Sequence, residues 1–314
     1  MERKLVIGIV NTNNKDLLKI NLTAVYKHKP GYDFEVIVFD NNSTDGSIEM
    51  IKLKFPKVRI IIGKDVGLER VGFGKGCNVI AENSKSEYIY FLNEDIEVQE
   101  DCFNILVDFL DKHSEAGCVS PKFLFPDGSL HKYIRKFPPR FFKSLSNLIT
   151  KAHKKKYNYN KINEIQFIGA ALYRRKAYEE VRGNGEDFFV GAEDIDLGYK
   201  LIQKNWKIYY CPTVHIIHHR TDSHSSIRNK NIDHAIKFRI SNSYGLLLFY
   251  KHNYKKYDVL FFRIKSFIRF YLKSLLSYYN KDSESYKVNY SIAKLMLNEE
   301  YGKKVISELK HNNT

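Results

Sequence analysis

Acidic and amide side chains follow two apolar segments of the chain, each at a point where a strand would end. Asp40 follows the apolar run 36–39, and an Asn-Glu-Asp cluster, residues 93–95, follows the run 88–92. A carboxylate there can accept hydrogen bonds from a base or ribose, and oxygens at i and i+2 of an extended segment can hold a hard divalent cation. The alternatives are a turn with a helix N-cap at Asp40 and an ordinary exposed loop at 93–95.

Three further acids, Glu193, Asp194 and Asp196, open a stretch with helical periodicity. The helix dipole stabilises acids in the first turn of a helix. The position of these acids can therefore be explained by helix stability alone, without a functional role. Upstream of them, the small residues Gly169 and Ala170 leave room for a sugar or an acceptor.

The elements that must position these residues alternate in the first half of the chain. Apolar runs at 5–10, 35–39, 58–62 and 88–92 predict strands, and amphipathic stretches at 15–27, 45–54 and 74–83 predict crossover helices. This pattern predicts an α/β fold with an open, mostly parallel sheet flanked by helices, whose ligands lie at the carboxyl ends of the strands.

The second half is organised differently. Pro/Gly turns follow residue 121, a basic stretch at 151–161 is typical of a solvated loop, and an organised block spans 166–211. We expect a catalytic domain over 1–225, with a nucleotide-sugar half at about 1–120 and an acceptor half at about 121–225. A helical, basic and aromatic appendage follows at 226–314.

Composition limits the class of protein. The 314 residues are 43% hydrophobic and 14% aromatic with a formal net charge of +15, which is a globular composition that favours an anionic partner. The first residues have no apolar leader and no uncharged run is long enough to span a membrane, which predicts a cytoplasmic protein. The four cysteines have no CxxC spacing, so we expect reduced thiols.

These motifs occur in an order that resembles a family 2 glycosyltransferase of the GT-A fold over about residues 4–226. The resemblance rests on the opening segment 6–14, Asp40, the glycine-rich segment 71–78, the 93–95 cluster and the acids that begin at Glu193. The resemblance implies that Asp40 binds the nucleotide base and that residues 93–95 form a DxD-type motif. Asn93 replaces the first acid of that motif, so Asp95 is expected to be the main metal or diphosphate ligand.

The glycine-rich segment resembles the rhamnosyltransferase-like branch of this family. It reads Gly72-Phe73-Gly74-Lys75-Gly76, whereas a dinucleotide fingerprint has GxGxxG spacing directly after the first strand. The glycines either let the backbone approach the donor or permit tight packing where a helix starts. The resemblance favours dTDP-rhamnose, followed by UDP-sugars, as the donor.

The resemblance also assigns the remaining site residues. The catalytic base is Asp194, with Glu193 as second choice and Asp196 as structural support. A Mg²⁺ or Mn²⁺ ion is held by Asp95 with His218, or with His219 as second choice. The remaining nucleotide-sugar contacts are assigned to Thr12, Asn13, Asn42, Gly72, Lys75, Asn78, Asn93, Glu94, Gly169, Ala170 and Arg174, and Arg175 is a further candidate to assist the diphosphate.

The histidines are compatible with two different roles as well. His218 and His219 fit ordinary surface histidines. With Cys211 and His215 nearby, a structural zinc site is conceivable, although the spacing is not that of a standard finger.

A helical stretch at 257–279 divides into a basic side, with Lys265, Arg269 and Lys273, and an apolar side. A basic amphipathic helix fits peripheral attachment to an anionic membrane surface, where lipid-linked acceptors reside. Packing of the apolar side on the catalytic domain and homodimerisation are the alternatives.

The sequence therefore predicts an inverting, metal-dependent hexosyltransferase for cell-surface polysaccharide synthesis. It would move a sugar from a nucleotide-diphosphate donor to a hydroxyl of a glycan or lipid-linked acceptor. The main alternative is a non-catalytic nucleotide-sugar or glycan-binding relative, supported by Asn93 in place of an acid. Nucleic acid is not an expected partner, because no recognised nucleic-acid motif occurs and acids crowd the site.

Overall fold

The computed structural model describes residues 3–134, 136–140, 158–166, 169–219 and 232–311. The chain divides into two compact units. The first comprises Met1–Phe137, Lys156–Glu186 and Leu197–Arg220, and the second comprises Pro138–Lys155, Asp187–Asp196 and Thr221–Thr314. The predicted boundary near residue 225 and most of the predicted basic loop at 151–161 lie outside the described residues.

The first unit is built on a mixed sheet, which has nine strands among the described residues. The predicted strands form β1 (Arg3–Asn11), β2 (Phe34–Asp40), β3 (Arg59–Ile62) and β4 (Ser86–Asn93), which pair in parallel in the order β3-β2-β1-β4. The structure confirms the predicted α/β class, and it adds that the sheet is mixed rather than purely parallel.

The mixed character comes from the second half of the sheet. Its long strands, β6 (Ala116–Leu124) and β9 (Lys207–His218), run parallel to each other. Short strands pair antiparallel with their neighbours: β5 (Ile96–Val98) and β7 (Asn163–Ile165) with β9, and β8 (Leu172–Arg174) with β4 and β6. The order from β4 onward is β4-β8-β6-β9-β5, so β8 joins the two halves of the sheet.

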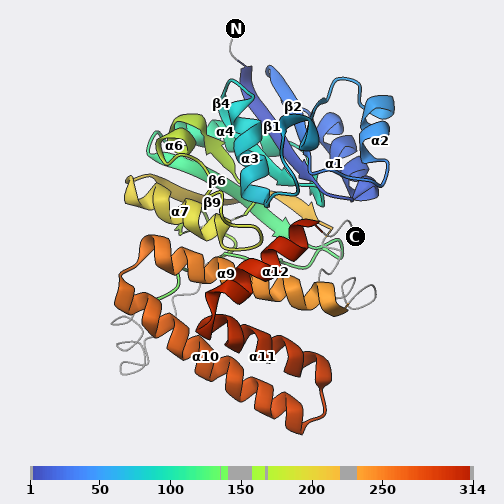
Figure 1. Cartoon of the computed structure of the whole chain (residues 1–314). Helices are drawn as coiled ribbons and strands as arrows, with labels where there is room; N and C mark the ends of the chain where they lie inside the picture. Colours follow the sequence, from blue (N-terminus) through green and yellow to red (C-terminus); the bar gives the residue numbers. More distant parts are fainter. Residues whose placement is uncertain (1–2, 135, 141–157, 167–168, 220–231, 312–314) are drawn as a thin grey trace. The chain divides into compact units, whose positions relative to one another are not determined.

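Both faces of the sheet are covered by helices, because the central strands are apolar on both sides (Figure 1). On β1, Leu5, Ile7 and Ile9 belong to one buried cluster, while Val6 and Val10 belong to the other, as the two-residue period of a strand requires. The first cluster includes residues of α1 (Lys15–Lys27), α2 (Ser47–Lys54) and α4 (Cys102–Lys112). The second includes residues of α3 (Phe73–Glu82), α6 (Arg175–Glu180) and α7 (Glu193–Gln203). A short 3-10 turn, η1 (Lys64–Val66), follows β3.

The second unit is mainly helical. It contains α9 (Ile232–Asn253), α10 (Lys256–Tyr279), α11 (Ser283–Leu297) and α12 (Glu299–His311). Its core includes Leu247 of α9, Leu295 of α11 and Val305 of α12, all buried. At Gly302 a Cβ would lie 2.6 Å from the Leu295 side chain and 2.7 Å from the Tyr244 ring, so a larger residue would force these side chains to move.

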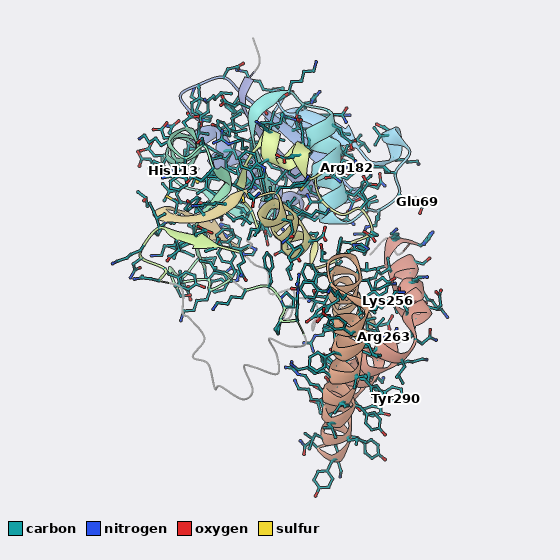
Figure 2. The ribbon with its side chains drawn as sticks, turned by 90° about the vertical axis from the view of Figure 1, so that its left-hand side faces the viewer. Glu69, His113, Arg182, Lys256, Arg263 and Tyr290 are labelled. Carbon is teal, nitrogen blue, oxygen red and sulfur yellow. The ribbon has the colours of Figure 1, made fainter. Side chains whose placement is uncertain are left out.

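The α10 and α11 helices form a hairpin within this unit. Figure 2 labels Lys256 and Arg263 on α10 and Tyr290 on α11. The Arg263 guanidinium donates to the carbonyls of Met296 and Leu297, at 2.7 and 3.1 Å, and so satisfies the C-terminal end of α11. None of the described helices combines the length and the apolar character needed to cross a membrane.

Candidate active site

The carboxyl ends of the central strands meet at one edge of the sheet. Asn11 at the end of β1 pairs in register with Asp40 at the end of β2, and Val10 pairs with Asn93 at the end of β4. The predicted acids at 40 and 93–95 therefore emerge from β2 and β4, the two strands that flank β1. This edge is where an open α/β sheet places its ligands.

The turn after β2 is held by Asp40. One carboxylate oxygen of Asp40 accepts from the Ser43 amide at 2.7 Å, and the other accepts from the Asn11 side chain at 2.9 Å. Asn11 also donates to the Ser43 hydroxyl at 3.1 Å. Because Asp40 is completely buried, its carboxylate organises the turn in this structure, and contact with a nucleotide base stays a prediction.

The loops beside this turn are joined by amide side chains. Asn13 accepts from the Thr44 amide at 2.7 Å, and Asn42 accepts from the Lys64 amide at 2.6 Å. Both have positive φ, which asparagine tolerates better than most residues. Asn41, which the sequence did not single out, donates to the Thr12 hydroxyl at 3.1 Å and to the Val71 carbonyl at 2.9 Å.

The glycine-rich segment begins α3, with Gly72 at its N-cap. A Cβ on Gly74 would lie 2.8 Å from Asn184, and one on Gly76 would lie 2.9 Å from Val10. Of the two roles that the sequence leaves open for these glycines, close packing accounts for Gly74 and Gly76. Lys75, between them, forms an ion pair with Glu186 at 2.6 Å.

Asn78 lies on the buried side of α3 and is occupied by protein groups. Its side-chain oxygen accepts from the Tyr178 hydroxyl at 2.6 Å and from the Asn184 amide at 2.9 Å. Its amide donates to the Asn184 carbonyl at 3.0 Å. Asn78 therefore anchors the loop after α6 in this structure, and its contact with a donor stays a prediction.

The 93–95 cluster begins at the last residue of β4 and continues as a turn, and its three residues are partly buried. The Asn93 carbonyl accepts from the Asn21 side chain at 2.9 Å, and Glu94 accepts from the Asn14 side chain at 3.2 Å. Burial, followed by the neighbouring charge of Asp95, raises the pKa of Glu94 to about 7.

Asp95 lies next to His218 because β5 pairs with the end of β9. β5 runs antiparallel to the end of β9, with Ile96 opposite His218, so the residue before β5 reaches the imidazole. One carboxylate oxygen of Asp95 lies 3.0 Å from Nε2 of His218. The other oxygen, Oδ1, is buried and has no hydrogen-bond partner among the described residues.

A third residue, His131, extends this pair and was missed from the sequence. Its Nδ1 lies 3.1 Å from Nδ1 of His218, so one ring nitrogen must carry the proton and the other accept it. The isolated bridge between Leu124 and Leu130 turns the chain back beside β6 and carries His131 toward β9. The Pro126-Asp127-Gly128 turn was the available signal, because it reverses the chain there.

His219 turns to a different acid. Its Nε2 lies 2.5 Å from Glu97, and its backbone amide donates to the Asp95 carbonyl at 2.8 Å. Successive residues of an extended segment point to opposite sides, which separates His219 from His218. In this structure His219 pairs with Glu97 rather than with Asp95, and its role as the second-choice metal ligand stays a prediction.

The residues at this edge fit a divalent cation. Asp95 offers a buried oxygen without a partner among the described residues, and carboxylate and imidazole are ligands for Mg²⁺ or Mn²⁺. In the described part of the chain, no three His, Cys, Asp or Glu side chains group as a metal site, which also leaves the zinc alternative without a cluster. Two protein ligands suffice for Mg²⁺ that is also bound by substrate phosphates.

Arg174 and Arg175 lie toward the opposite end of β4. Arg174 pairs in register with Tyr88, and its guanidinium donates to the carbonyls of Ala116, Leu110 and His113 at 3.1, 2.6 and 3.2 Å. Arg175 donates to the carbonyls of Ser86 and Ala81. Both guanidinium groups are engaged with carbonyls away from the carboxyl edge in this structure, and their contact with the donor stays a prediction.

The small residues upstream of β8 differ in their surroundings. A Cβ added to Gly169 would meet nothing within 4 Å, and the use of this space by a sugar or an acceptor stays a prediction. Ala170 is buried with a φ of 39°, and its carbonyl accepts from the Ser120 hydroxyl at 3.3 Å.

The predicted base lies at the start of α7, in the second unit. Glu193 has a buried Oε2 without a hydrogen-bond partner among the described residues, and burial, followed by the charge of Asp194, raises its pKa to about 7. Asp194 accepts from the Ile195 amide at 2.8 Å. Asp196 is buried and accepts from the Asn253 side chain at 2.7 Å, which ties the helix start to α9.

Comparison with known proteins assigns a class to this fold and site. The model of the family described as "Glycosyl transferase family 2" matches residues 6–182, more than half of the chain. The chain belongs to this family and is a glycosyltransferase.

Its curated relatives include rhamnosyltransferases. The chain is 24% identical over 206 residues to the N-acetylglucosaminyl-diphospho-decaprenol L-rhamnosyltransferase of Mycobacterium tuberculosis, covering 60% of this chain and 67% of that protein. It is 29% identical over 190 residues to the rhamnosyltransferase WbbL of Escherichia coli, covering 56% of this chain and 70% of that one.

The solved structures support the fold. The crystal structure of GalNAc-T7 with UDP, GalNAc and Mn²⁺ has a TM-score of 0.59 and 16% identity to this chain. The alignment covers 98% of this chain and 58% of that chain, so this protein spans little more than half the length of that neighbour.

Proposed function

We propose that this chain transfers a sugar, with inversion at the anomeric carbon, from a nucleotide-diphosphate donor to a hydroxyl of a glycan or lipid-linked acceptor in cell-surface polysaccharide synthesis. The observation that carries the proposal is the pair of Asp95 and His218 at the carboxyl edge of the sheet, where a buried carboxylate oxygen has no partner among the described residues. A donor diphosphate is the substrate group that such a metal-compatible edge suits.

Several residues are proposed to act at the diphosphate of the donor or beside it. Asp95 and His218 would hold a Mg²⁺ or Mn²⁺ ion, which supplies positive charge to the departing nucleoside diphosphate. Lys75 on the first turn of α3 adds a cation, and its partner Glu186 is exposed and can release it. Asn93 and Glu94 directly precede the proposed ligand Asp95, and Asn14 orients the Glu94 carboxylate.

The acceptor hydroxyl loses its proton to a carboxylate at the start of α7. The family resemblance favours Asp194 as the base, whereas the burial of Glu193 and its raised pKa favour Glu193. A pKa of about 7 makes Glu193 a stronger base than an ordinary carboxylate, near the optimum for transfer at neutral pH. The deprotonated oxygen attacks the anomeric carbon opposite the leaving diphosphate, and this single displacement inverts the centre.

The proposed donor is dTDP-rhamnose, with UDP-sugars as the second class. Support comes from the two relatives named as rhamnosyltransferases and from the glycine-rich segment. UDP-sugars are supported by a neighbour of similar fold whose crystal structure holds UDP, GalNAc and Mn²⁺.

The test is release of nucleoside diphosphate by the purified protein from a panel of donors with Mg²⁺, Mn²⁺ or EDTA. Release from one donor that EDTA abolishes, and that Asp95→Ala reduces at least about tenfold, supports the proposal. Asp194→Asn and Glu193→Gln preserve the shape of each side chain. The base is the residue whose variant loses turnover while it still binds the donor.

A non-catalytic relative is the second candidate, favoured by Asn93 at the position of an acid. It predicts donor-dependent thermal stabilisation without release. Asn93→Asp separates the two, since restoring the acid would strengthen metal-dependent release only in an enzyme.

A further inference from the structure

The α10 helix exposes its large apolar side. Successive residues of a helix are about 100° apart, so residues three or four positions apart share a side. Six large apolar residues with this spacing form what we call the outer face: Leu260, Ile264, Ile268, Tyr271, Leu275 and Tyr278. Their exposed fractions run from 41% to 73%, whereas an amphipathic helix of a globular protein normally turns its apolar side inward.

The opposite side of α10 is the one that is buried. Ser266 and Ser274 are at most 9% exposed, and helical spacing places them away from the outer face. α10 packs mainly on α11, with further contacts to α9. The hairpin therefore buries small polar residues of α10 and leaves the six residues of the outer face exposed. A contiguous apolar strip of this size is typical of an interaction surface.

Positive charge runs from the flank of the outer face, at Lys265, toward the other side of the helix, at Lys273. Lys265, Arg269 and Lys273 are exposed and four residues apart, so they form one row along the helix. The side-chain cations of Arg269 and Lys273 lie 5.8 and 6.0 Å from the Phe270 ring, so both stems run along the helix surface. In α10, all of which is described, the one acid is the buried Asp258.

We propose that the outer face and its basic row dock α10 flat on an anionic lipid bilayer. Apolar side chains enter the headgroup boundary, tyrosine rings suit its polar depth, and long cations reach lipid phosphates. The helix lies on the surface, in keeping with the absence of any described helix suited to spanning.

Charge decides between a bilayer and a second copy of this chain. The spacing of the outer face would also suit a helix from another protomer. A symmetric pair would bring two basic rows together, and the described α10 offers no exposed acid to neutralise them. An anionic bilayer supplies the missing negative charge, at about fivefold in binding for each lysine or arginine near the surface.

The test is flotation of the full chain with vesicles of phosphatidylcholine alone or mixed with phosphatidylglycerol, without donor or metal, so the result is independent of the transfer reaction. One variant combines Lys265→Gln, Arg269→Gln and Lys273→Gln, and a second combines Ile264→Ser, Ile268→Ser and Leu275→Ser. The matched controls change exposed residues of the first unit by the same chemistry: Lys52→Gln with Lys54→Gln and Lys57→Gln, and Ile20→Ser with Leu53→Ser and Val66→Ser.

We expect the chain to float with mixed vesicles and not with phosphatidylcholine alone, and less so at high salt. The basic-row variant should bind about a hundredfold more weakly. The outer-face variant should bind at least about tenfold more weakly, and its circular dichroism spectrum should be unchanged. Both control variants should bind as the parent does.

Two results would overturn the proposal. One is a parent chain that stays unbound on mixed vesicles and forms a dimer that the outer-face variant disperses, which would make the face a self-interface. The other is an unbound parent whose melting temperature falls in the outer-face variant, which would mean that the face packs within its own chain.

Discussion

Glu193→Gln should stabilise the protein at alkaline pH and leave it nearly unchanged in acid. The raised pKa means that the folded state holds the Glu193 proton between the ordinary value of 4.5 and about 7, where the unfolded state has released it. Stability therefore falls as pH rises through this window, and above it the buried charge destabilises the fold by a constant amount. Glutamine has the same shape and no charge to bury.

The size of the effect follows from the gap between the two pKa values. One pKa unit corresponds to about 1.4 kcal/mol, so the full difference is about 3 kcal/mol at pH 8 and less than about 1 kcal/mol at pH 5. The free energy of unfolding in urea, measured for parent and variant at both pH values, gives this difference directly.

Asp196→Ala is the matched control at the same helix start. It removes the acceptor of the Asn253 amide, so it should lower the free energy of unfolding by about 1–3 kcal/mol at both pH values. The reasoning on Glu193 is refuted if Glu193→Gln is no more stable than the parent at pH 8, or if its advantage is the same at pH 5.

Three further outcomes can be checked separately. His131→Phe should raise the Mn²⁺ concentration for half-maximal diphosphate release about 10–100-fold, because His131 orients the proposed ligand His218; an unchanged metal titration would rule this out. Arg174→Met should lower the free energy of unfolding by about 2–3 kcal/mol yet keep the donor KM, which a donor-binding role would not allow. Gly183→Ala should destabilise by more than Gly67→Ala in urea titrations, since both glycines have positive φ but only at Gly183 would a Cβ lie 2.4 Å from Asn78.

The parallel half of the fold could be predicted because its signals are local. Each of the four predicted strands is an apolar run, and each predicted helix lies within a few residues of its observed bounds. The short strands β5, β7 and β8 have three residues each, and their pairing depends on neighbours far along the chain. Such strands carry no periodicity long enough to recognise, so the mixed half of the sheet was not predicted.

The position of a site residue could be predicted where it follows from the residue type and from the end of a strand. It could not be predicted where it depends on the direction of a long side chain or on a partner far along the chain. Asp95 and His218 were singled out for the same metal, and the structure brings them within 3.0 Å although 123 residues separate them. The surroundings of Arg174 could not be predicted, because the sequence does not show to which end of a strand a long side chain turns. The turn at 126–128 reverses the chain before His131, but that turn does not identify the partner His218, which lies 87 residues further on.

The position of β9 also limits how the protein can be shortened. The family match ends at residue 182, yet β9 lies between β6 and β5 in the sheet and is the only described partner of β7. A fragment cut at the end of the match would expose the edge of β6, release β5 and β7, and lose His218. Open edges of this kind invite pairing with other chains, so such a fragment should aggregate. Expression of the catalytic unit therefore has to extend at least through residue 219.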